Sequence, residues 1–287
     1  MTKPRMLVTG GSGYLGGWVV RLARDDWDVT ATCLSQPVDR SGGDWRQLDV
    51  RDTAMVEALV GEVHPQVIVH TAALNPGQGT DFDGVNAVGT RHVARAAANV
   101  GARLIHISTD VLFDGQKGNY VEEDPPSPVT PYGRSKALAE EEVHNSGAEA
   151  VIVRTSLIYG WRPTVARAAQ WMFDTLEAGK PLRLFTDEIR CPVWVESLAA
   201  AAVELATLPY TSVLNVAGAQ ALSRYAFGVR LLRFHGVDPR PAVPIPSPPG
   251  ISHPRDCTLD CSRARALLQT PLPGVDEVLT THRNRAG

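Results

Sequence analysis

The feature that most constrains this chain is a glycine-rich turn at residues 9–16 (TGGSGYLG), directly after the apolar residues 6–8. The turn contains both G-x-G-x-x-G, from Gly11, and G-x-x-G-x-x-G, from Gly10. Glycine suits such a turn because it adopts positive φ and lets the backbone approach a ligand closely. Amides at the start of the following helix also stabilise an anion. We therefore expect a dinucleotide pyrophosphate to contact Gly10, Ser12, Gly13, Tyr14, Leu15 and Gly16.

Strand and helix patterns alternate through the first half of the chain. Branched apolar runs that predict buried parallel strands occur at residues 6–9, 29–33, 67–70, 104–107 and 151–154. Helical patterns lie between them at residues 14–25, 53–61, 84–100 and 132–145. Asp52 is the expected N-cap of the second helix. The alternation predicts an α/β fold, a Rossmann-like doubly wound parallel sheet with right-handed crossovers.

The regular alternation ends near residue 157, which predicts a second lobe. We expect a Rossmann domain that binds NAD(P) at residues 1–157 plus about 186–215, and a smaller C-terminal substrate-binding lobe at 158–185 and 216–287. Further helices are expected at residues 164–178, 196–207, 222–234 and 262–268, and a strand at 182–185. Residues 238–254 contain seven prolines, too many for a helix or a central strand. Two interpretations of that segment remain: a stiff surface loop and a lip of the substrate pocket.

Composition excludes several classes of protein. The chain has 287 residues, of which 44% are hydrophobic and 21% charged, as expected of a globular protein. Its 28 basic and 31 acidic residues are mixed, so nucleic acid is not an expected partner. No apolar run approaches the length of about 18 residues that a membrane helix needs, and none near the start is long enough for a signal peptide. Four cysteines without a C-x-x-C pair indicate buried thiols in a reducing cytoplasm, without disulfide or zinc.

Acid–base chemistry is indicated by Tyr132 and Lys136, a Y-x-x-x-K pair that lies on one face of a helix. A neighbouring ammonium favours the phenolate, so we expect Lys136 to lower the pKa of Tyr132 and make it a competent proton donor. Thr109 follows a predicted strand, at the sheet edge where ligands of open α/β folds bind. Its hydroxyl is a candidate donor to a substrate carbonyl.

The remaining cofactor candidates follow other strands. Residues 48–50 are expected to end a third strand, where Asp49 and Val50 reach the adenine; a helix cap is the equal alternative for Asp49. Residues 70–73 end the fourth strand, where small Ala72 and Ala73 let a cofactor lie close, whereas His70 is expected in the core. Asn86, near a helix start, is either a cofactor neighbour or surface.

Cofactor preference is indicated by the end of the second strand. An NAD site usually has an acidic residue there for the ribose 2′-hydroxyl. Here the position is Cys33, followed by Leu-Ser-Gln. The absence of an acid favours NADPH, with NADH still open. Arg40 is the nearest candidate for the 2′-phosphate, and a solvated loop arginine is at least as good an interpretation.

Together these motifs resemble extended short-chain dehydrogenases/reductases, specifically the branch of dTDP-4-dehydrorhamnose reductase, over nearly the whole chain. The resemblance rests on residues 9–16, 70–73, 85–90, 107–115 (ISTDVLFDG), 132–136, 153–160, 187–200 and 255–266. It implies a catalytic triad of Thr109, Tyr132 and Lys136, with Lys136 also on the nicotinamide ribose. It further implies reduction of a nucleotide-linked 4-keto-6-deoxy sugar, as in dTDP-rhamnose biosynthesis. The expected substrate contacts are Asp110, Leu157, Arg190 and Arg255, the two arginines for the diphosphate.

Two departures from the branch affect what the resemblance implies. Residues 17–19 are apolar where the bacterial branch often has an acid used in a magnesium-linked dimer, so we expect no structural metal. Leu157 stands where the branch usually has Trp, which leaves the sugar open. Two alternatives remain: an epimerase or dehydratase that retains NAD, for which Asp110 is suggestive, and a non-catalytic subunit like the regulatory β subunit of methionine adenosyltransferase. A homodimer is also open.

Overall fold

A seven-stranded parallel sheet forms the centre of the computed structural model, which describes residues 2–35, 43–161, 167–248 and 253–284. In spatial order its strands are β11 (Ser212–Asn215), β6 (Ala150–Arg154), β5 (Arg103–Ile107), β4 (Val67–His70), β1 (Arg5–Thr9), β2 (Asp28–Cys33) and β3 (Asp44–Gln47). From β1 the sheet is first extended on one side by β2 and β3. It is then extended on the other side of β1 by β4, β5, β6 and β11. This reversal is the switch point of a doubly wound fold, so the predicted fold class is confirmed.

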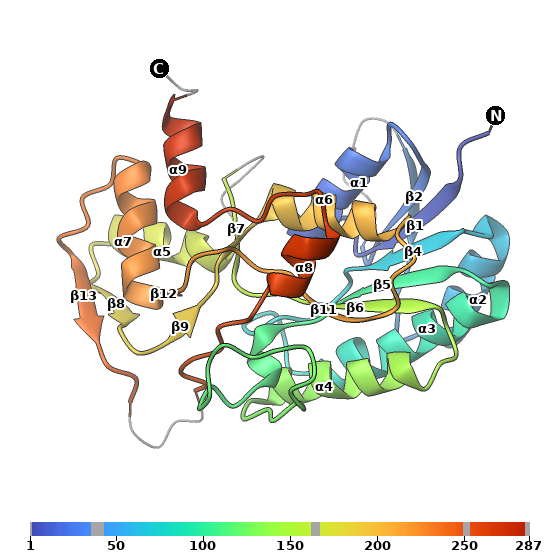
Figure 1. The fold of residues 1–287 in the computed structure, drawn as a ribbon, viewed down its shortest axis with the longest axis horizontal. Coiled ribbons are helices and arrows are strands. Elements are labelled where there is room, and N and C mark those ends of the chain that lie inside the picture. Colours follow the sequence, from blue (N-terminus) through green and yellow to red (C-terminus); the bar gives the residue numbers. More distant parts are fainter. Residues whose placement is uncertain (1, 36–42, 162–166, 249–252, 285–287) are drawn as a thin grey trace.

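Helices cover both faces of the sheet (Figure 1). One face carries α1 (Tyr14–Ala23), α6 (Val195–Leu205) and α8 (Ser262–Leu267); the other carries α2 (Thr53–Val63), α3 (Gly89–Val100) and α4 (Pro131–His144). Strand residues alternate between the two cores: Met6 and Val8 pack with α1 and α6, whereas Leu7 packs with α2 and α3. The predicted N-cap is confirmed, because the Asp52 carboxylate accepts a hydrogen bond from the Met55 amide at 3.1 Å.

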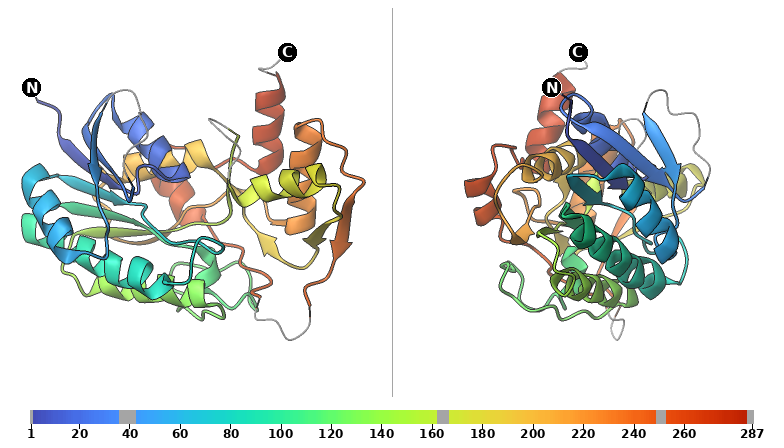
Figure 2. Two further views of the ribbon diagram at one scale, coloured as in Figure 1. Left: turned by 180° about the vertical axis from the view of Figure 1, so that it is seen from behind. Right: turned by 90° about the vertical axis from the view of Figure 1, so that its right-hand side faces the viewer.

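The smaller lobe lies beside the carboxyl edge of the sheet (Figure 2). Its elements are α5 (Arg167–Glu177), β8 (Leu182–Phe185), α7 (Arg224–Phe234), β13 (Ala242–Ile245) and α9 (Val275–Asn284), with short pairings of β9 (Ile189–Arg190) with β12 (Leu222–Ser223) and of β7 (Ile158–Tyr159) with β10 (Val193–Trp194). They share a third apolar core that includes Met172, Leu184 and Phe227. The first residues of the helix predicted at 164–178 lie outside the described part of the chain.

The structure corrects three predicted segments. The third strand ends at Gln47, so residues 48–50 follow it rather than end it. The proline-rich segment contains β13, which pairs in parallel with β8; Pro244 is tolerated because β13 is an edge strand. The helix predicted at 84–100 begins as a π-helical turn, η1 (Asp83–Val88), before α3.

The boundary between the lobes also differs from the prediction near the C-terminus. Residues 216–287 were expected in the smaller lobe, yet Cys257, Cys261 and Ala264 pack into the sheet core beside α6. The apolar face of α8 therefore packs against the larger lobe. The chain returns to the smaller lobe with α9, where Val275 and Val278 are buried.

A buried ion pair fastens α4 to the sheet. The Arg154 guanidinium, at the end of β6, donates to the Glu140 carboxylate at 2.8 Å, and both side chains are almost completely buried. Ser108 donates to the same carboxylate at 2.6 Å. Removing one partner of such a pair leaves an uncompensated charge in a medium of low dielectric.

Replacing Arg154 by Met should therefore lower the free energy of unfolding by about 3–5 kcal/mol, as measured by urea denaturation. The matched control is Arg230→Met, which removes a partly exposed pair with Asp276 and should cost about 0–1 kcal/mol. Equal losses in the two variants would show that the buried pair has no special role.

Candidate active site

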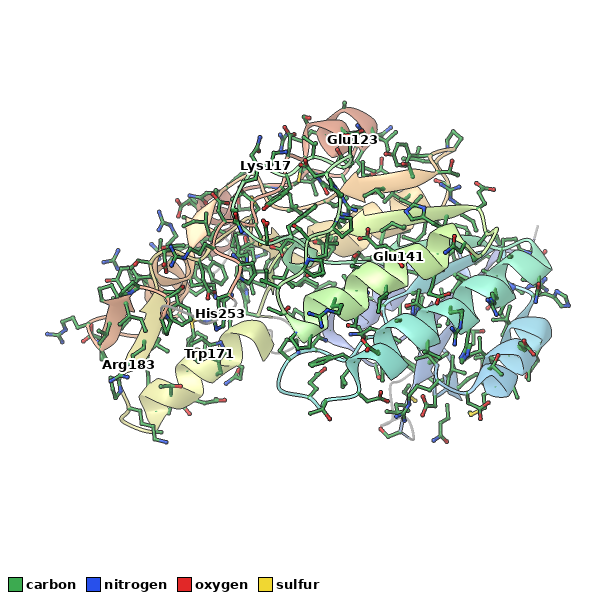
Figure 3. All side chains as sticks on the ribbon, turned by 90° about the horizontal axis from the view of Figure 1, so that it is seen from below. Lys117, Glu123, Glu141, Trp171, Arg183 and His253 are labelled. Carbon is green, nitrogen blue, oxygen red and sulfur yellow. The ribbon has the colours of Figure 1, made fainter. Side chains whose placement is uncertain are left out.

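A cleft of about 2060 Å³ opens at the switch point between β1 and β4. One wall is formed by the ends of the sheet strands, and the other by the smaller lobe, including Trp171, Arg183 and His253. These three side chains are labelled on the smaller lobe in Figure 3. The cleft therefore lies where open α/β folds bind their ligands.

The glycine turn fits a pyrophosphate closely. Gly10 has φ +70°, and a Cβ there would lie 2.6 Å from the Ala72 backbone nitrogen. A Cβ on Gly16 would lie 2.7 Å from the Thr71 hydroxyl oxygen. Side chains at these positions would push the turn away from β4, so the turn remains a concave backbone surface at the start of α1. All six residues predicted from this turn line the cleft: Gly10, Ser12, Gly13, Tyr14, Leu15 and Gly16.

The region predicted for the adenosine half of a dinucleotide also lines the cleft. Cys33, Asp49 and Val50 lie there together with Ala72 and Ala73. Arg51 donates to the Asp49 carboxylate at 2.6 Å and holds its pKa below the usual value. Asp49 is thus already paired with a side chain that the sequence did not indicate. Arg40 lies outside the described residues.

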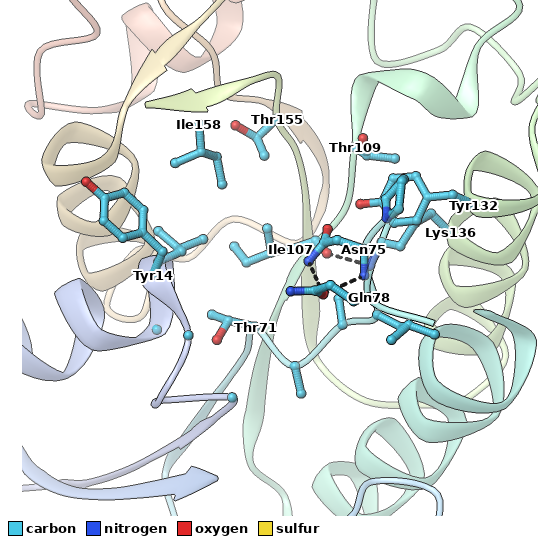
Figure 4. Close-up of a pocket in the computed structure, with 18 of the residues that line it drawn as sticks. Tyr14, Thr71, Asn75, Gln78, Ile107, Thr109, Tyr132, Lys136, Thr155 and Ile158 are labelled. Carbon is cyan, nitrogen blue, oxygen red and sulfur yellow. Dashed lines mark hydrogen bonds between the residues drawn. The ribbon is translucent and has the colours of Figure 1, made fainter. Parts of the chain in front are cut away.

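The predicted catalytic residues come together on one side of the cleft. Figure 4 shows Thr109, Tyr132 and Lys136 there, with Tyr14 and Thr71 on the other side. Thr130 caps α4 by accepting the Gly133 amide at 3.0 Å, and Pro131 occupies the first turn. This start places Tyr132 in the first turn of α4, on the same side of the cleft as Thr109.

The predicted lowering of the Tyr132 pKa by Lys136 is wrong in this structure. Burial raises the pKa of Tyr132 to about 12, and the nearby Thr109 side chain opposes this shift. Lys136 donates to the Ile107 carbonyl at 2.7 Å, and burial lowers its own pKa to about 8, with Glu140 opposing. At neutral pH Tyr132 therefore keeps its proton while most Lys136 side chains carry a charge.

Asn86 and His70 are buried behind the cleft. Asn86 does not line it; its side-chain amide donates to the Leu74 carbonyl at 3.0 Å and to the Ser135 hydroxyl at 3.0 Å, so it joins the loop after β4 to α4. Asn86 lies in the π-helical turn η1, a feature often found at functional sites, and its side-chain oxygen accepts a hydrogen bond from the Leu74 amide at 2.8 Å. His70 is a hydrogen-bonded core residue, as predicted, bonded to Thr9 and Thr90.

The predicted substrate residues are divided between the cleft and the surface. Asp110, Leu157 and Arg190 line the cleft, but Arg255 does not, and its side chain is 63% exposed beside Asp187. The Arg190 guanidinium donates to the carbonyls of Ile189, Pro254 and Arg255 at 2.7–2.9 Å. Asp110 accepts from Ser156 at 2.6 Å and lies 3.8 Å from Arg190, while burial raises its pKa. The Arg190 guanidinium is thus bound mainly by backbone carbonyls of the protein itself.

Sequence reasoning missed Arg224, which lines the cleft from the first turn of α7. Within the described part of the chain its guanidinium makes no hydrogen bond. Burial lowers its pKa, and the nearby charges are Arg190, Glu188 and Asp110. No motif marks Arg224 in the sequence. The pairing of β12 with β9 and the bond from the Arg224 amide to the Glu188 carbonyl, at 2.9 Å, bring it to the cleft.

The described residues show neither a metal site nor a membrane helix. Among the described residues, no group of three or more His, Cys, Asp or Glu side chains is arranged to hold a metal ion. None of the described helices combines the length and apolar character needed to cross a membrane. The four cysteines are buried free thiols, as predicted.

The fold, the glycine turn and the Tyr–Lys pair define a dinucleotide-binding protein of the extended short-chain dehydrogenase/reductase type. A family described as RmlD substrate binding domain matches residues 4–285. The chain belongs to this family.

Individual relatives agree with that assignment. The chain is 32% identical over 256 residues to dTDP-4-dehydrorhamnose reductase of Mycobacterium tuberculosis, covering 85% of this chain and 79% of the relative. It is 28% identical over 278 residues to methionine adenosyltransferase 2 subunit beta of Mus musculus, covering 92% and 82%. A crystal structure of dTDP-4-dehydrorhamnose reductase from Bacillus anthracis in complex with NADP superposes with a TM-score of 0.84 at 25% identity, covering 98% of both chains.

Replacing Gly10 by Ala should raise the dissociation constant for a nicotinamide dinucleotide by more than about 10-fold, because positive φ is unfavourable for Ala and the new Cβ would meet Ala72. Fluorescence titration measures this constant. The control Gly61→Ala adds a methyl group to open space in α2 and should stabilise the protein by about 0.4–1 kcal/mol, with unchanged cofactor binding. Unchanged binding in the Gly10 variant would place the pyrophosphate elsewhere.

Proposed function

We propose that this protein is an NADPH-dependent reductase of a nucleotide-linked 4-keto-6-deoxy sugar. One observation carries the proposal: Thr109, Tyr132 and Lys136 line the same cleft as the glycine turn, so a proton donor faces the place where a nicotinamide would lie. The relative from M. tuberculosis supports the choice of sugar. Leu157, in place of the Trp usual in the branch, leaves the choice among deoxysugars to experiment.

The chain's own residues supply binding and the proton, and bound NADPH would supply a hydride. The hydroxyl groups of Thr109 and Tyr132 lie on the same side of the cleft and together would hold the carbonyl oxygen of the substrate. As that oxygen gains negative charge, Tyr132 gives its proton to it and becomes a phenolate. The buried Lys136 ammonium, which is mostly charged at neutral pH, would hold the cofactor ribose.

NADPH is favoured over NADH by the end of β2. Cys33 and the exposed Leu34 offer no carboxylate to bind a ribose 2′-hydroxyl or to repel a 2′-phosphate. The relative from B. anthracis, whose structure contains NADP, supports the same choice. Comparing kcat/KM for NADPH and NADH tests it directly.

Arg224 is the proposed contact of the substrate diphosphate. A guanidinium suits phosphate oxygens because its donors form a planar fork. The Arg224 donors have no acceptor in the described structure, whereas those of Arg190 are directed at backbone carbonyls. Arg255, the other candidate from the sequence, would have to move from the surface to contribute.

The central experiment is NADPH oxidation by the purified protein with a panel of nucleotide-linked 4-keto sugars. Turnover with one of them supports the reductase. Tightly bound NAD that is released only on denaturation supports the epimerase or dehydratase alternative. Absence of oxidation across the panel, with co-purification of a larger synthetase, supports a regulatory subunit, which the relative from Mus musculus keeps in consideration.

We extend the proposal to the cellular location of the protein, the roles of its two lobes and its oligomeric state. Four buried thiols fit a reducing cytoplasm, and the two lobes would form the cofactor and substrate halves of the cleft. A homodimer is tested by light scattering of the purified chain.

Replacing Tyr132 by Phe should lower kcat about 10²- to 10⁴-fold, the usual effect of removing a positioned acid, with little change in cofactor affinity. The matched control is Tyr159→Phe. The Tyr159 hydroxyl is buried in the smaller lobe and has no hydrogen-bond partner among the described residues, so its loss should leave kcat near the parental value. A parental rate for Tyr132→Phe would remove Tyr132 from the mechanism.

Replacing Arg224 by Met should raise KM for the sugar nucleotide about 10- to 100-fold, because hydrogen bonds to charged groups are lost. Steady-state kinetics with a truncated keto sugar lacking the diphosphate should show little difference between variant and parent. Arg240→Met, at a highly exposed position in the smaller lobe, is the control for loss of charge alone. A larger effect from Arg255→Met would assign the diphosphate to that residue instead.

A further inference from the structure

The ammonium of Lys136 is buried next to neutral acceptors. Its side chain is 2% exposed, and Nζ donates to the Ile107 carbonyl at 2.7 Å. The other recorded neighbour of Nζ is the Nε2 atom of His106, at 3.3 Å. Within the described part of the chain, no carboxylate lies within 4.0 Å of Nζ. Glu140, one turn further along α4, is already bound by Arg154 and Ser108.

His106 differs from its neighbour His70 in how its nitrogens are used. The two residues are partners in the register of β4 and β5, and their rings lie 5.4 Å apart. Both nitrogens of His70 have hydroxyl partners, Thr9 at 2.6 Å and Thr90 at 3.1 Å. The Nδ1 atom of His106 has no hydrogen-bond partner among the described residues. The interaction that His106 makes is therefore the one with Lys136.

The chemistry of the two side chains fixes the direction of this hydrogen bond. Burial, aided by the charge on Lys136, keeps the pKa of His106 well below its usual value, so the imidazole is neutral. A neutral imidazole has one donor and one acceptor, whereas an ammonium has donors alone. Nε2 must then accept from Lys136, and Nδ1 carries the proton. An apolar ring at residue 106 would fill the same space and would leave no buried N–H group without a partner. We therefore attribute the presence of histidine here to its hydrogen bond with Lys136.

We propose that His106 is a positioning residue, whose Nε2 atom holds the charged Lys136 side chain in place behind Tyr132. The proposal rests on the role given to Lys136 under the proposed function. The titratable groups around Lys136 are Tyr132 and Glu140 on α4, His106 on β5 and His70 on β4. Arg154 balances Glu140, His70 is neutral, and Tyr132 keeps its proton at neutral pH. His106 is thus the group whose removal alters the Lys136 ammonium directly.

The first test measures NADPH affinity against pH, since a charged Lys136 is needed on the ribose. Parental affinity should fall as pH rises through about 8, where Lys136 loses its proton. His106→Phe removes the acceptor and disfavours the ammonium. It should move this alkaline limb of the NADPH affinity profile down by about one pH unit. His106→Gln keeps an acceptor near the Nε2 position and should restore the limb. The control His70→Phe should leave it in place.

Kinetics give a second measure with the same variants. In His106→Phe the alkaline limb of kcat should move together with the limb of NADPH affinity, while KM for the ketone at acidic pH stays near the parental value. A merely structural role would lower Tm without moving either limb. Unmoved limbs in a folded His106→Phe protein would overturn the proposal.

A measurement on the unaltered protein covers the case in which that variant fails to fold. ¹⁵N-histidine NMR, with His106 assigned by its loss in His106→Gln, should show Nδ1 protonated and Nε2 unprotonated below pH 8. Protonated Nε2 would overturn the proposal. This result does not depend on the substrate, so failure to bind or oxidise NADPH would count against the proposed function, while the tautomer alone would decide the role of His106.

Discussion

The rest of the cleft depends on a close approach between two turns, one after β1 and one after β4. The backbone of Gly10 lies so near Ala72 that there is no room for a Cβ, and Gly16 packs equally closely on Thr71. Because the chain reverses its direction across the sheet between these strands, the turns diverge above them and leave a space at the sheet edge. The N-terminus of α1 faces that space, so an anion is stabilised there by backbone groups alone.

The opposite side of the cleft depends on the polar inner face of α4. Ser135, Lys136 and Glu140 are buried there, although helices in doubly wound folds usually pack through apolar side chains. Each polar group is paired: Ser135 with Asn86, Lys136 with Ile107 and His106, Glu140 with Arg154. Burying charges is unfavourable unless such pairs form, so α4 has one favourable register on the sheet. That register places Tyr132, one turn before Lys136, beside Thr109.

Local patterns predicted the strands and the turn well, because these depend on nearby residues. Short continuous apolar runs between helical patterns are typical of strands buried on both faces of a parallel sheet, and glycine at residue 10 satisfies a positive φ that other residues avoid. Predictions failed where distant contacts decide. Pro244 lies in β13, an edge strand that tolerates its missing N–H group, and the Asn86 side chain is held inside the protein by hydrogen bonds to Leu74 and Ser135. Arg224 carries no motif, so its place at the cleft depends on the packing of the smaller lobe.

The sequence by itself determined the class of fold, the dinucleotide turn and the Tyr132–Lys136 pair, because strand burial, positive φ and helical spacing are local properties of a chain. Tertiary structure alone decided the pKa values of that pair. Burial raises the pKa of Tyr132 to about 12 and lowers the pKa of Lys136 to about 8, while the Lys136 ammonium lies beside His106 and donates to the Ile107 carbonyl. Desolvation and hydrogen-bond partners come from strands far away in the sequence, so spacing along a helix cannot predict a pKa.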